Sequence, residues 1–214
     1  MDALIAGYRR FRAGYYEQQK AKFEHLGAKG QTPQYMIIGC ADSRVDPSIN
    51  FDTGPGDVFM VRNVANVVPP YAPDGDHHGT SAAIEFAVKG LDIPNIVILG
   101  HAKCGGIAAL VDREPGDAPT NDFLDLWMSV ARPARRAAIR LAEAVGVADD
   151  RTEVCRICEK ENVKVGLKNL MGFPWIAERV AAGRLKLHGL YFDITKGELY
   201  RLNDGGDFDL VPPA

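Results

Sequence analysis

Short apolar segments alternate with longer stretches of mixed apolar and charged residues along the chain. Five of these segments have the length of strands: 35–38, 58–61, 95–99, 185–192 and 198–202. Short runs rich in branched apolar residues are typical of buried strands. The last two segments are separated by Lys196 and Gly197, which predict the turn of a terminal hairpin.

Most of the residues between these segments show apolar positions at helical spacing. The predicted helices span 2–27, 80–89, 104–111, 122–146 and 152–171, and a last one begins at Pro174 and ends before Gly183. Thr80 can cap its helix, and proline is favoured in the first turn of a helix. Residues 46–56 contain two glycines and two prolines and predict a loop.

Strands that alternate with helices predict an α/β fold. We expect a mainly parallel central β-sheet with an antiparallel edge strand, flanked by helices. Because we find no internal repeat or linker, we expect residues 1–214 to form a single domain with a helical arm at 1–30. The arm precedes every strand, so we expect it to pack on a partner subunit.

Composition narrows the class of protein. Hydrophobic residues make up 46% and charged residues 25% of the 214 residues, which is ordinary for a globular domain. The formal net charge of −3 argues against a nucleic-acid partner, and no run approaches the roughly 18 apolar residues that predict a membrane span. The first 20 residues lack the features of a signal peptide, so we expect a cytoplasmic protein whose four cysteines are free thiols or metal ligands.

Two polar segments follow predicted strands directly. Cys40 begins the segment 40–44 after the first strand, and the segment 100–106 after the third strand contains His101 and Cys104. In open α/β sheets, ligands bind at the carboxyl ends of strands, where the strand order reverses. If the two strands are neighbours, these three residues form a Cys₂His set that suits one Zn²⁺ per subunit and leaves a fourth position open for water.

Two thiolates cancel the charge of Zn²⁺, so such a centre acidifies water less than a dicationic one. We therefore expect catalysis by the zinc-bound hydroxide to increase with pH. We also expect a second group to hold this hydroxide. If residues 40–44 are extended, Asp42 and Arg44 point to the same side as Cys40. Asp42 could accept the hydrogen bond of the hydroxide while Arg44 keeps it ionised, although Asp42 could instead occupy the open position itself.

The remaining cysteines and histidines are weaker candidates. Cys155 and Cys158 lie in a predicted helix, so we interpret them as buried core thiols. A four-cysteine zinc site stays open, but it would leave His101 without a role. His77 and His78 lie in a glycine-flanked loop and are expected to be solvated, with proton transfer as an alternative.

The sequence resembles the β-class carbonic anhydrases over nearly its whole length. The residues that carry the resemblance are 40–45, 61–66, 79–85, 100–106 and 158–163. The resemblance implies zinc held by Cys40, His101 and Cys104, with Asp42 and Arg44 as the supporting pair. It also implies a homodimer or higher homo-oligomer with its active sites at the subunit interface and the N-terminal helix lying over the partner.

The resemblance further implies a substrate pocket for CO₂ and bicarbonate. Its side chains correspond to Gln31, Phe59, Val64 and Phe86, and the backbone N–H of Gly105 should face the substrate. Phe86 stands where plant-like members of the family have a tyrosine, so one hydroxyl is missing.

Some bacterial members bind bicarbonate at a regulatory site made of tryptophan, arginine and tyrosine. The corresponding residues are Ile37, Arg62 and Phe192. Two of the three are lost, so we expect no such regulation.

Three functions are compatible with these features. The first is reversible hydration of carbon dioxide to bicarbonate and a proton, by zinc-bound hydroxide assisted by the Asp42–Arg44 pair. The second is hydrolysis of carbonyl sulfide or carbon disulfide, which are linear isosteres of CO₂, on the same fold. The third is a non-catalytic module with structural zinc, although structural zinc sites usually have four protein ligands.

Overall fold

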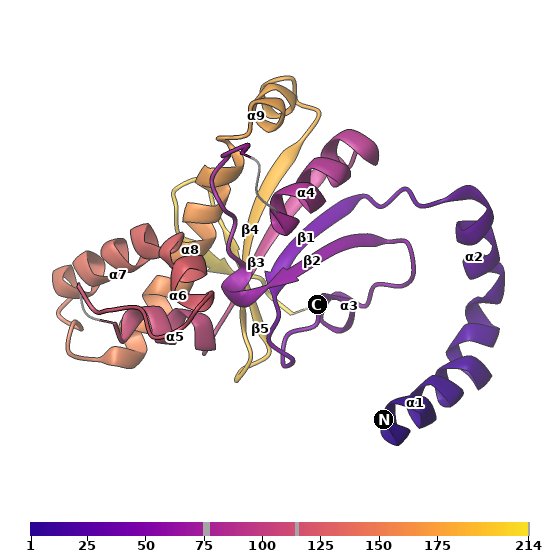
Figure 1. Cartoon of the computed structure of the whole chain (residues 1–214), viewed down its shortest axis with the longest axis horizontal. Coiled ribbons are helices and arrows are strands. Elements are labelled where there is room, and N and C mark those ends of the chain that lie inside the picture. Colours follow the sequence, from indigo (N-terminus) through magenta and orange to yellow (C-terminus); the bar gives the residue numbers. More distant parts are fainter. Residues whose placement is uncertain (75–77, 114–115, 214) are drawn as a thin grey trace.

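The computed structural model describes residues 1–74, 78–113 and 116–213. Within this part of the chain, six strands form one sheet in the order β2-β1-β3-β4-β5-β6 (Figure 1). The strands are β1 (Tyr35–Cys40), β2 (Val58–Asn63), β3 (Asn95–His101), β4 (Lys186–Asp193), β5 (Glu198–Leu202) and β6 (Phe208–Leu210). The first four strands are parallel, β5 is antiparallel to β4, and β6 is antiparallel to β5. The predicted mainly parallel sheet is therefore confirmed, with β6 as an additional edge strand that the sequence did not predict.

Helices connect the strands, and several of them pack against the faces of the sheet. They are α1 (Asp2–Ala13), α2 (Tyr15–Lys29), α3 (Pro47–Asn50), α4 (Gly79–Glu85), α5 (Gly105–Val111), α6 (Leu124–Ser129), α7 (Arg132–Ala144), α8 (Arg151–Leu170) and α9 (Pro174–Ala181). Side chains alternate along β1, because successive residues of a strand point to opposite faces. Met36 and Ile38 enter the core beneath α4, α8 and α9, whereas Ile37 packs on the opposite face with Val45 and Leu99.

Two predicted helices are each divided into two. The predicted helix 2–27 breaks at Gly14, whose φ of −116° and ψ of −88° are not helical. Glycine costs about 1 kcal/mol in a helix interior relative to alanine, which makes it a natural breaking point. The predicted helix 122–146 is interrupted between α6 and α7, where Pro133 lies in the first turn of α7. Proline has no N–H to continue a preceding helix, but it fits the start of a new one.

Two shorter segments also differ from the prediction. The predicted loop 46–56 contains α3, because the side chain of Asp46 accepts a hydrogen bond from the backbone N–H of Ser48 and caps this turn. The predicted helix 80–89 begins as α4 but ends in a π-helical turn, Phe86–Gly90. That turn leaves the ring of Phe86 exposed, as described below.

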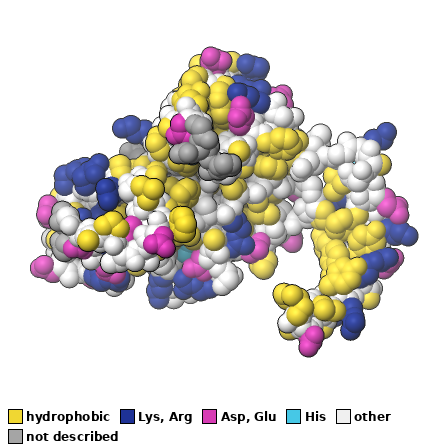
Figure 2. All heavy atoms as spheres, viewed as in Figure 1, with side chains coloured by type: hydrophobic (Ala, Val, Ile, Leu, Met, Phe, Trp, Pro, Cys, Tyr) yellow, Lys and Arg dark blue, Asp and Glu magenta, His cyan; other side chains and the backbone are white. Residues whose placement is uncertain are grey.

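The N-terminal helices α1 and α2 stand clear of the sheet (Figure 1) and contain no buried residue. Figure 2 shows apolar side chains gathered on the side of this arm that is turned towards the body. The large exposed apolar residues of α1 and α2 are Leu4, Ile5, Tyr8, Phe11 and Tyr15. An ion pair between Lys22 and Asp57, with 2.8 Å between nitrogen and oxygen, connects α2 to the segment before β2. No helix in the described ranges is both long and apolar enough to cross a membrane.

Candidate metal centre

The three predicted donors come together at the carboxyl edge of the sheet. Cys40 is the last residue of β1 and His101 is the last residue of β3. These strands are adjacent and parallel, and β2 lies on the other side of β1, so the strand order reverses here. Cys104 follows one short turn later, at the N-cap of α5. The fold thus brings residues 64 positions apart in sequence to one point.

The donor atoms are close enough to share one metal ion. The three ligand atoms lie within 4.8 Å of one another, and the Sγ atoms of Cys40 and Cys104 are 4.0 Å apart. Two thiolates bound to one tetrahedral zinc at about 2.3 Å would be about 3.8 Å apart. All three side chains are buried. The donor set and its spacing therefore fit zinc.

The imidazole of His101 is oriented for metal binding. Its Nδ1 lies 2.9 Å from the carbonyl oxygen of Ala102, and a carbonyl can only accept, so Nδ1–H is the donor. The other nitrogen, Nε2, is buried and has no hydrogen-bond partner in the described part of the chain. A buried nitrogen without a partner costs free energy. In metal-binding histidines one ring nitrogen donates a hydrogen bond that fixes the ring, which leaves the other nitrogen to bind the metal.

The electrostatics of the site favour a cation. A hydrogen bond from Cys104 lowers the pKa of the Cys40 thiol, which favours its thiolate form. The same hydrogen bond, together with burial, raises the pKa of Cys104. Burial alone would lower the pKa of His101, but the neighbouring Cys40 thiolate favours the protonated imidazole and raises it. A site that draws a proton towards a buried imidazole also attracts a metal cation.

Asp42 and Arg44 form a two-pronged ion pair beside the donors. Arg44 Nε donates to Asp42 Oδ1 at 2.9 Å, and Arg44 Nη2 donates to Asp42 Oδ2 at 2.7 Å. The backbone N–H of Arg44 also donates to Oδ1 at 2.9 Å. The side-chain hydrogen bonds from Arg44 hold the pKa of Asp42 well below its usual range. The carboxylate is therefore ionised and turned towards the guanidinium.

Arg62 holds the loop that carries this pair. Its Nε donates to the carbonyl of Cys40 at 2.9 Å, and its Nη2 donates to the carbonyls of Asp42 and Val45 at 2.7 and 2.8 Å. Its Nη1 contacts the carboxylate of Asp46 at 3.3 Å. The guanidinium is fully engaged, which the sequence did not predict, although residues 61–66 were among those that carried the family resemblance.

A buried carboxylate behind the site was also missed. Glu159 on α8 is 4% exposed, and its Oε1 accepts a hydrogen bond from the backbone N–H of Cys104 at 3.0 Å. Its Oε2 accepts from the hydroxyl of Tyr191 at 2.8 Å. The available signal was an acidic residue inside a helix segment, 158–163, that resembles the family.

Two of the predicted pocket residues lie near the three donors. Gly105 directly follows Cys104 and opens α5. Val64 begins the 3-10 turn η1 (Val64–Asn66) after β2 and is 40% exposed. A Cβ atom added to Gly106 would lie only 2.8 Å from Cγ1 of Val64, so glycine lets α5 approach this turn closely.

Phe59 lies away from the donors of its own chain. In the register of β1 and β2, Cys40 pairs with Asn63, whereas Phe59 pairs with Met36 near the opposite end of β1. Four residues of extended strand span about 13 Å at about 3.3 Å per residue. The side chain of Phe59 therefore belongs to a different part of the sheet.

Phe86 and Gln31 lie in the same part of the molecule as Phe59. The rings of Phe59 and Phe86 are in contact, with centroids 5.8 Å apart, and Phe86 is 53% exposed. Gln31 precedes the amino end of β1 and is also exposed. The structure thus divides the predicted pocket into two groups that do not meet within one chain.

The other predicted candidates are not part of the site. Cys155 and Cys158 are buried in α8, as expected, at 8% and 0% exposure. His78 is exposed and pairs with Asp74, with 2.6 Å between nitrogen and oxygen. His77 lies outside the described residues.

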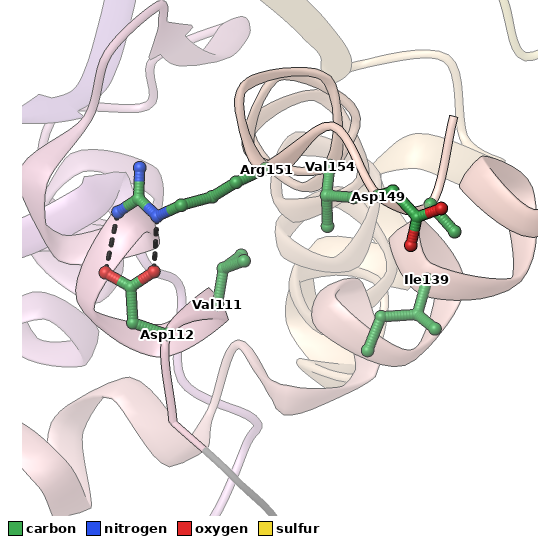
Figure 3. A pocket seen from close by; sticks show the side chains of 7 residues that line it. Val111, Asp112, Ile139, Asp149, Arg151 and Val154 are labelled. Carbon is green, nitrogen blue, oxygen red and sulfur yellow. Dashed lines mark hydrogen bonds and ion pairs between the residues drawn. The ribbon is translucent and has the colours of Figure 1, made fainter.

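A separate cavity lies between the end of α5, α7 and the start of α8 (Figure 3). Its volume is about 350 Å³, and its lining includes an ion pair in which Arg151 Nη2 donates to Asp112 Oδ2 at 2.6 Å. Its other lining residues are Val111, Ile139, Ala148, Asp149 and Val154. None of the three donors lines it, so this cavity is separate from the candidate metal centre.

Fold and site together define an α/β protein with a candidate metal centre of two cysteines and one histidine at the switch point of its sheet. The profile of the family described as carbonic anhydrase matches residues 35–199. The chain therefore belongs to the carbonic anhydrase family, in its β class.

Individual relatives agree with this assignment. The chain is 36% identical to beta carbonic anhydrase 3 of Arabidopsis thaliana over 217 residues, which cover 99% of this chain and 80% of that protein. It superposes on the structure of the beta-carbonic anhydrase CcaA with a TM-score of 0.86 and 30% identity, covering 100% of this chain and 92% of that one. A tetrameric beta-carbonic anhydrase of Sordaria macrospora gives a TM-score of 0.80 with 33% identity, covering 94% and 96% of the two chains.

Proposed function

We propose that this protein catalyses the reversible hydration of carbon dioxide to bicarbonate and a proton, with one Zn²⁺ held by Cys40, His101 and Cys104. The observation that carries the proposal is the buried Nε2 of His101, which has no partner in the described chain, in a cluster whose imidazole and two thiol ligand atoms lie within 4.8 Å of one another. Thiol and imidazole donors match the preference of zinc, and three protein ligands are typical of catalytic rather than structural sites. Zinc, when bound, supplies the Lewis acidity that makes water a nucleophile near neutral pH.

Asp42 acts as the hydrogen-bond acceptor for the attacking water. Its carboxylate is ionised and fixed by Arg44, so it can accept a hydrogen bond from the attacking water without rotating. The pair also restrains Asp42 from turning towards the metal ligands, because such a rotation would break both bonds to the guanidinium. Arg44 is therefore proposed to keep the open position free for water.

The substrate pocket is proposed to be shared between two copies of the chain. Val64 and Gly105 come from the chain that supplies the donors, and Gln31, Phe59 and Phe86 come from its partner. This division is supported by the register of the sheet, which keeps Phe59 far from its own Cys40, and by the exposure of Phe86. An exposed aromatic pair is a suitable wall for apolar CO₂ once a second copy covers it.

The N-terminal arm is proposed to hold the two copies together. Residues 1–30 would form this arm and lie over the partner, while the rest of the 214 residues form one domain. The support is the apolar surface of α1 and α2, which no part of the described chain covers (Figure 2). The proposed assembly is a homodimer or a higher homo-oligomer.

Two further expectations belong to the same proposal. Bicarbonate is not expected to regulate the enzyme, because Ile37 and Phe192 replace the two aromatic residues and the guanidinium of Arg62 is engaged by the 40–46 loop. A cytoplasmic location is proposed because all four cysteines are free and buried, which suits a reducing compartment.

The proposed activity is tested by stopped-flow CO₂ hydration before and after removal of zinc with a chelator. We expect the rate to fall to the background level without zinc and to return when one equivalent of zinc per chain is added. A metal-free protein that keeps the full rate would refute the proposal. Faster turnover of carbonyl sulfide than of CO₂ in a parallel assay would assign the enzyme to the alternative substrate.

A further inference from the structure

The peptide bond between Lys103 and Cys104 is held from two sides. Its carbonyl, that of Lys103, accepts a hydrogen bond from Arg44 Nη2 at 3.0 Å. Its N–H, that of Cys104, donates to Oε1 of Glu159 at 3.0 Å. One peptide unit therefore connects the Asp42–Arg44 pair on the exposed side with a buried carboxylate on the other.

This peptide lies in a strained part of the backbone. Lys103 has a φ of +58°, in the left-handed region. A residue other than glycine loses about 1–2 kcal/mol in that conformation, so surrounding contacts must hold it there. Backbone N–H groups of such a turn form a concave site for an anion, and the carboxylate of Glu159 occupies that position.

Glu159 is itself fixed from behind. Its second oxygen accepts from the hydroxyl of Tyr191, which is 2% exposed. The Nζ atom of Lys160 lies 5.1 Å from the centre of the Tyr191 ring and 5.0 Å from that of Tyr200, which restrains the phenol. Burial raises the pKa of Glu159, although hydrogen bonds from Cys104 and Tyr191 oppose this. Burial of a carboxyl group is costly unless it is hydrogen-bonded, and both oxygens of Glu159 have such partners.

We propose that Glu159 is a positioning residue of the metal centre, whose buried carboxylate fixes the Lys103–Cys104 peptide and thereby sets both the thiol of Cys104 and the guanidinium of Arg44. The inference rests on the proposed zinc site. It gives a role to Glu159, which lies in the segment 158–163 that the proposed mechanism does not use. Tyr191 supports this carboxylate through the hydrogen bond that its hydroxyl donates to Glu159.

Partners behind metal ligands typically change metal affinity by 10- to 100-fold when they are lost. We expect Glu159→Ala to weaken zinc binding by about that factor. Glu159→Gln should have a smaller effect, because its amide oxygen can still accept from Cys104 while its amide nitrogen can donate to Tyr191. Tyr191→Phe keeps the carboxylate and should also have a small effect.

Glu161→Gln is the matched control. Glu161 lies on the same helix and loses the same charge on substitution, but it pairs with Lys164, with 2.5 Å between oxygen and nitrogen. We expect this variant to bind zinc as the wild-type protein does. A general effect of charge on α8 would weaken zinc binding in both glutamine variants alike, and that result would contradict the inference.

The experiment measures zinc affinity by competition with a chromophoric chelator and the absorption spectrum of the cobalt-substituted protein, with circular dichroism to establish that each variant is folded. We expect altered cobalt bands and weakened zinc binding in Glu159→Ala, with partial rescue in Glu159→Gln. If Glu159→Ala does not fold, Glu159→Gln and Tyr191→Phe decide, because both should shift the cobalt bands slightly while the Glu161→Gln control shifts them not at all.

Variants that are less stable but keep wild-type zinc affinity and cobalt spectra would overturn the inference and leave Glu159 with a purely structural role. This outcome differs from failure of the proposed function. In that case the wild-type protein itself would bind no zinc, and both proposals would fall together.

Discussion

At the residue scale, the side chain of Asp42 has two possible partners, the guanidinium of Arg44 and a metal ion. The structure favours the guanidinium, because two side-chain hydrogen bonds of 2.9 and 2.7 Å and one backbone bond converge on the carboxylate. Charge-assisted, two-pronged bonds of this kind are among the strongest hydrogen bonds in proteins. We therefore propose that Asp42 serves as an acceptor and not as a ligand.

The substitution Asp42→Asn tests this role. Asparagine keeps the size of the side chain but replaces one acceptor oxygen with a donor, so the attacking water loses its acceptor. We expect kcat/KM for CO₂ hydration to fall by about 10²- to 10³-fold, within the range for lost acid–base assistance. Zinc content, measured by atomic absorption, should stay at one per chain. A variant with nearly unchanged kcat/KM would show that Asp42 takes no part.

At the element scale, the turn η1 matters because it carries Val64 next to α5. Ala65 and Asn66 have positive φ values of 64° and 46°, and Ala65 is fully buried. Two residues of α6 and α8 hold this turn from outside. Trp127 Nε1 donates to the carbonyl of Val64 at 2.9 Å, and Asn162 Nδ2 donates to the carbonyl of Ala65 at 2.8 Å.

Loss of the Asn162 bond should therefore destabilise the protein and disturb the site. In Asn162→Leu the buried carbonyl of Ala65 keeps no partner, which costs about 1–3 kcal/mol. We expect the free energy of unfolding in urea to fall by about that amount, and CO₂ hydration to decrease. Asn169→Leu is a control, since Asn169 donates at 2.8 Å to Val68, further from the donors. Equal loss of activity in both variants would argue against a specific role of η1.

The strands and the donors could be predicted from local patterns. The run 95–99 is apolar and short, and His101 and Cys104 follow it directly, so strand and site were both recognisable. The division of the helix at Gly14 and the strand β6 were missed, because short elements depend on tertiary contacts more than on periodicity. Glu159 was missed because its hydrogen-bond partners are 55 and 32 residues away in sequence.

At the scale of the whole molecule, we propose that the pocket is completed where two copies meet. The donors lie at the carboxyl edge of the sheet, while Phe59 and Phe86 lie about 13 Å or more along it, by the rise of a strand. Exposed apolar residues on the arm supply a further surface for association. We therefore expect each active site to use side chains from both chains.

Mixing two inactive variants tests this sharing. His101→Ala removes a donor, and Gln31→Ala removes a proposed pocket residue. In a mixed dimer, the intact donors of the Gln31→Ala chain meet the intact Gln31 of the other chain, so one site is complete. We expect co-refolded equal mixtures to regain about a quarter of the wild-type activity per chain, measured by stopped flow. No recovery above the two separate variants would place Gln31 and the donors of one chain in the same site.

The central claim is that three side chains hold the metal and leave its fourth position to solvent. A crystal structure of the zinc-loaded protein near pH 7.5, with anomalous data at the zinc edge, tests it most directly. We predict one zinc bonded to Cys40, His101 and Cys104 and to a water molecule, with Asp42 still bonded to Arg44. A zinc ion bonded to Asp42, or a zinc ion bound elsewhere, would contradict it.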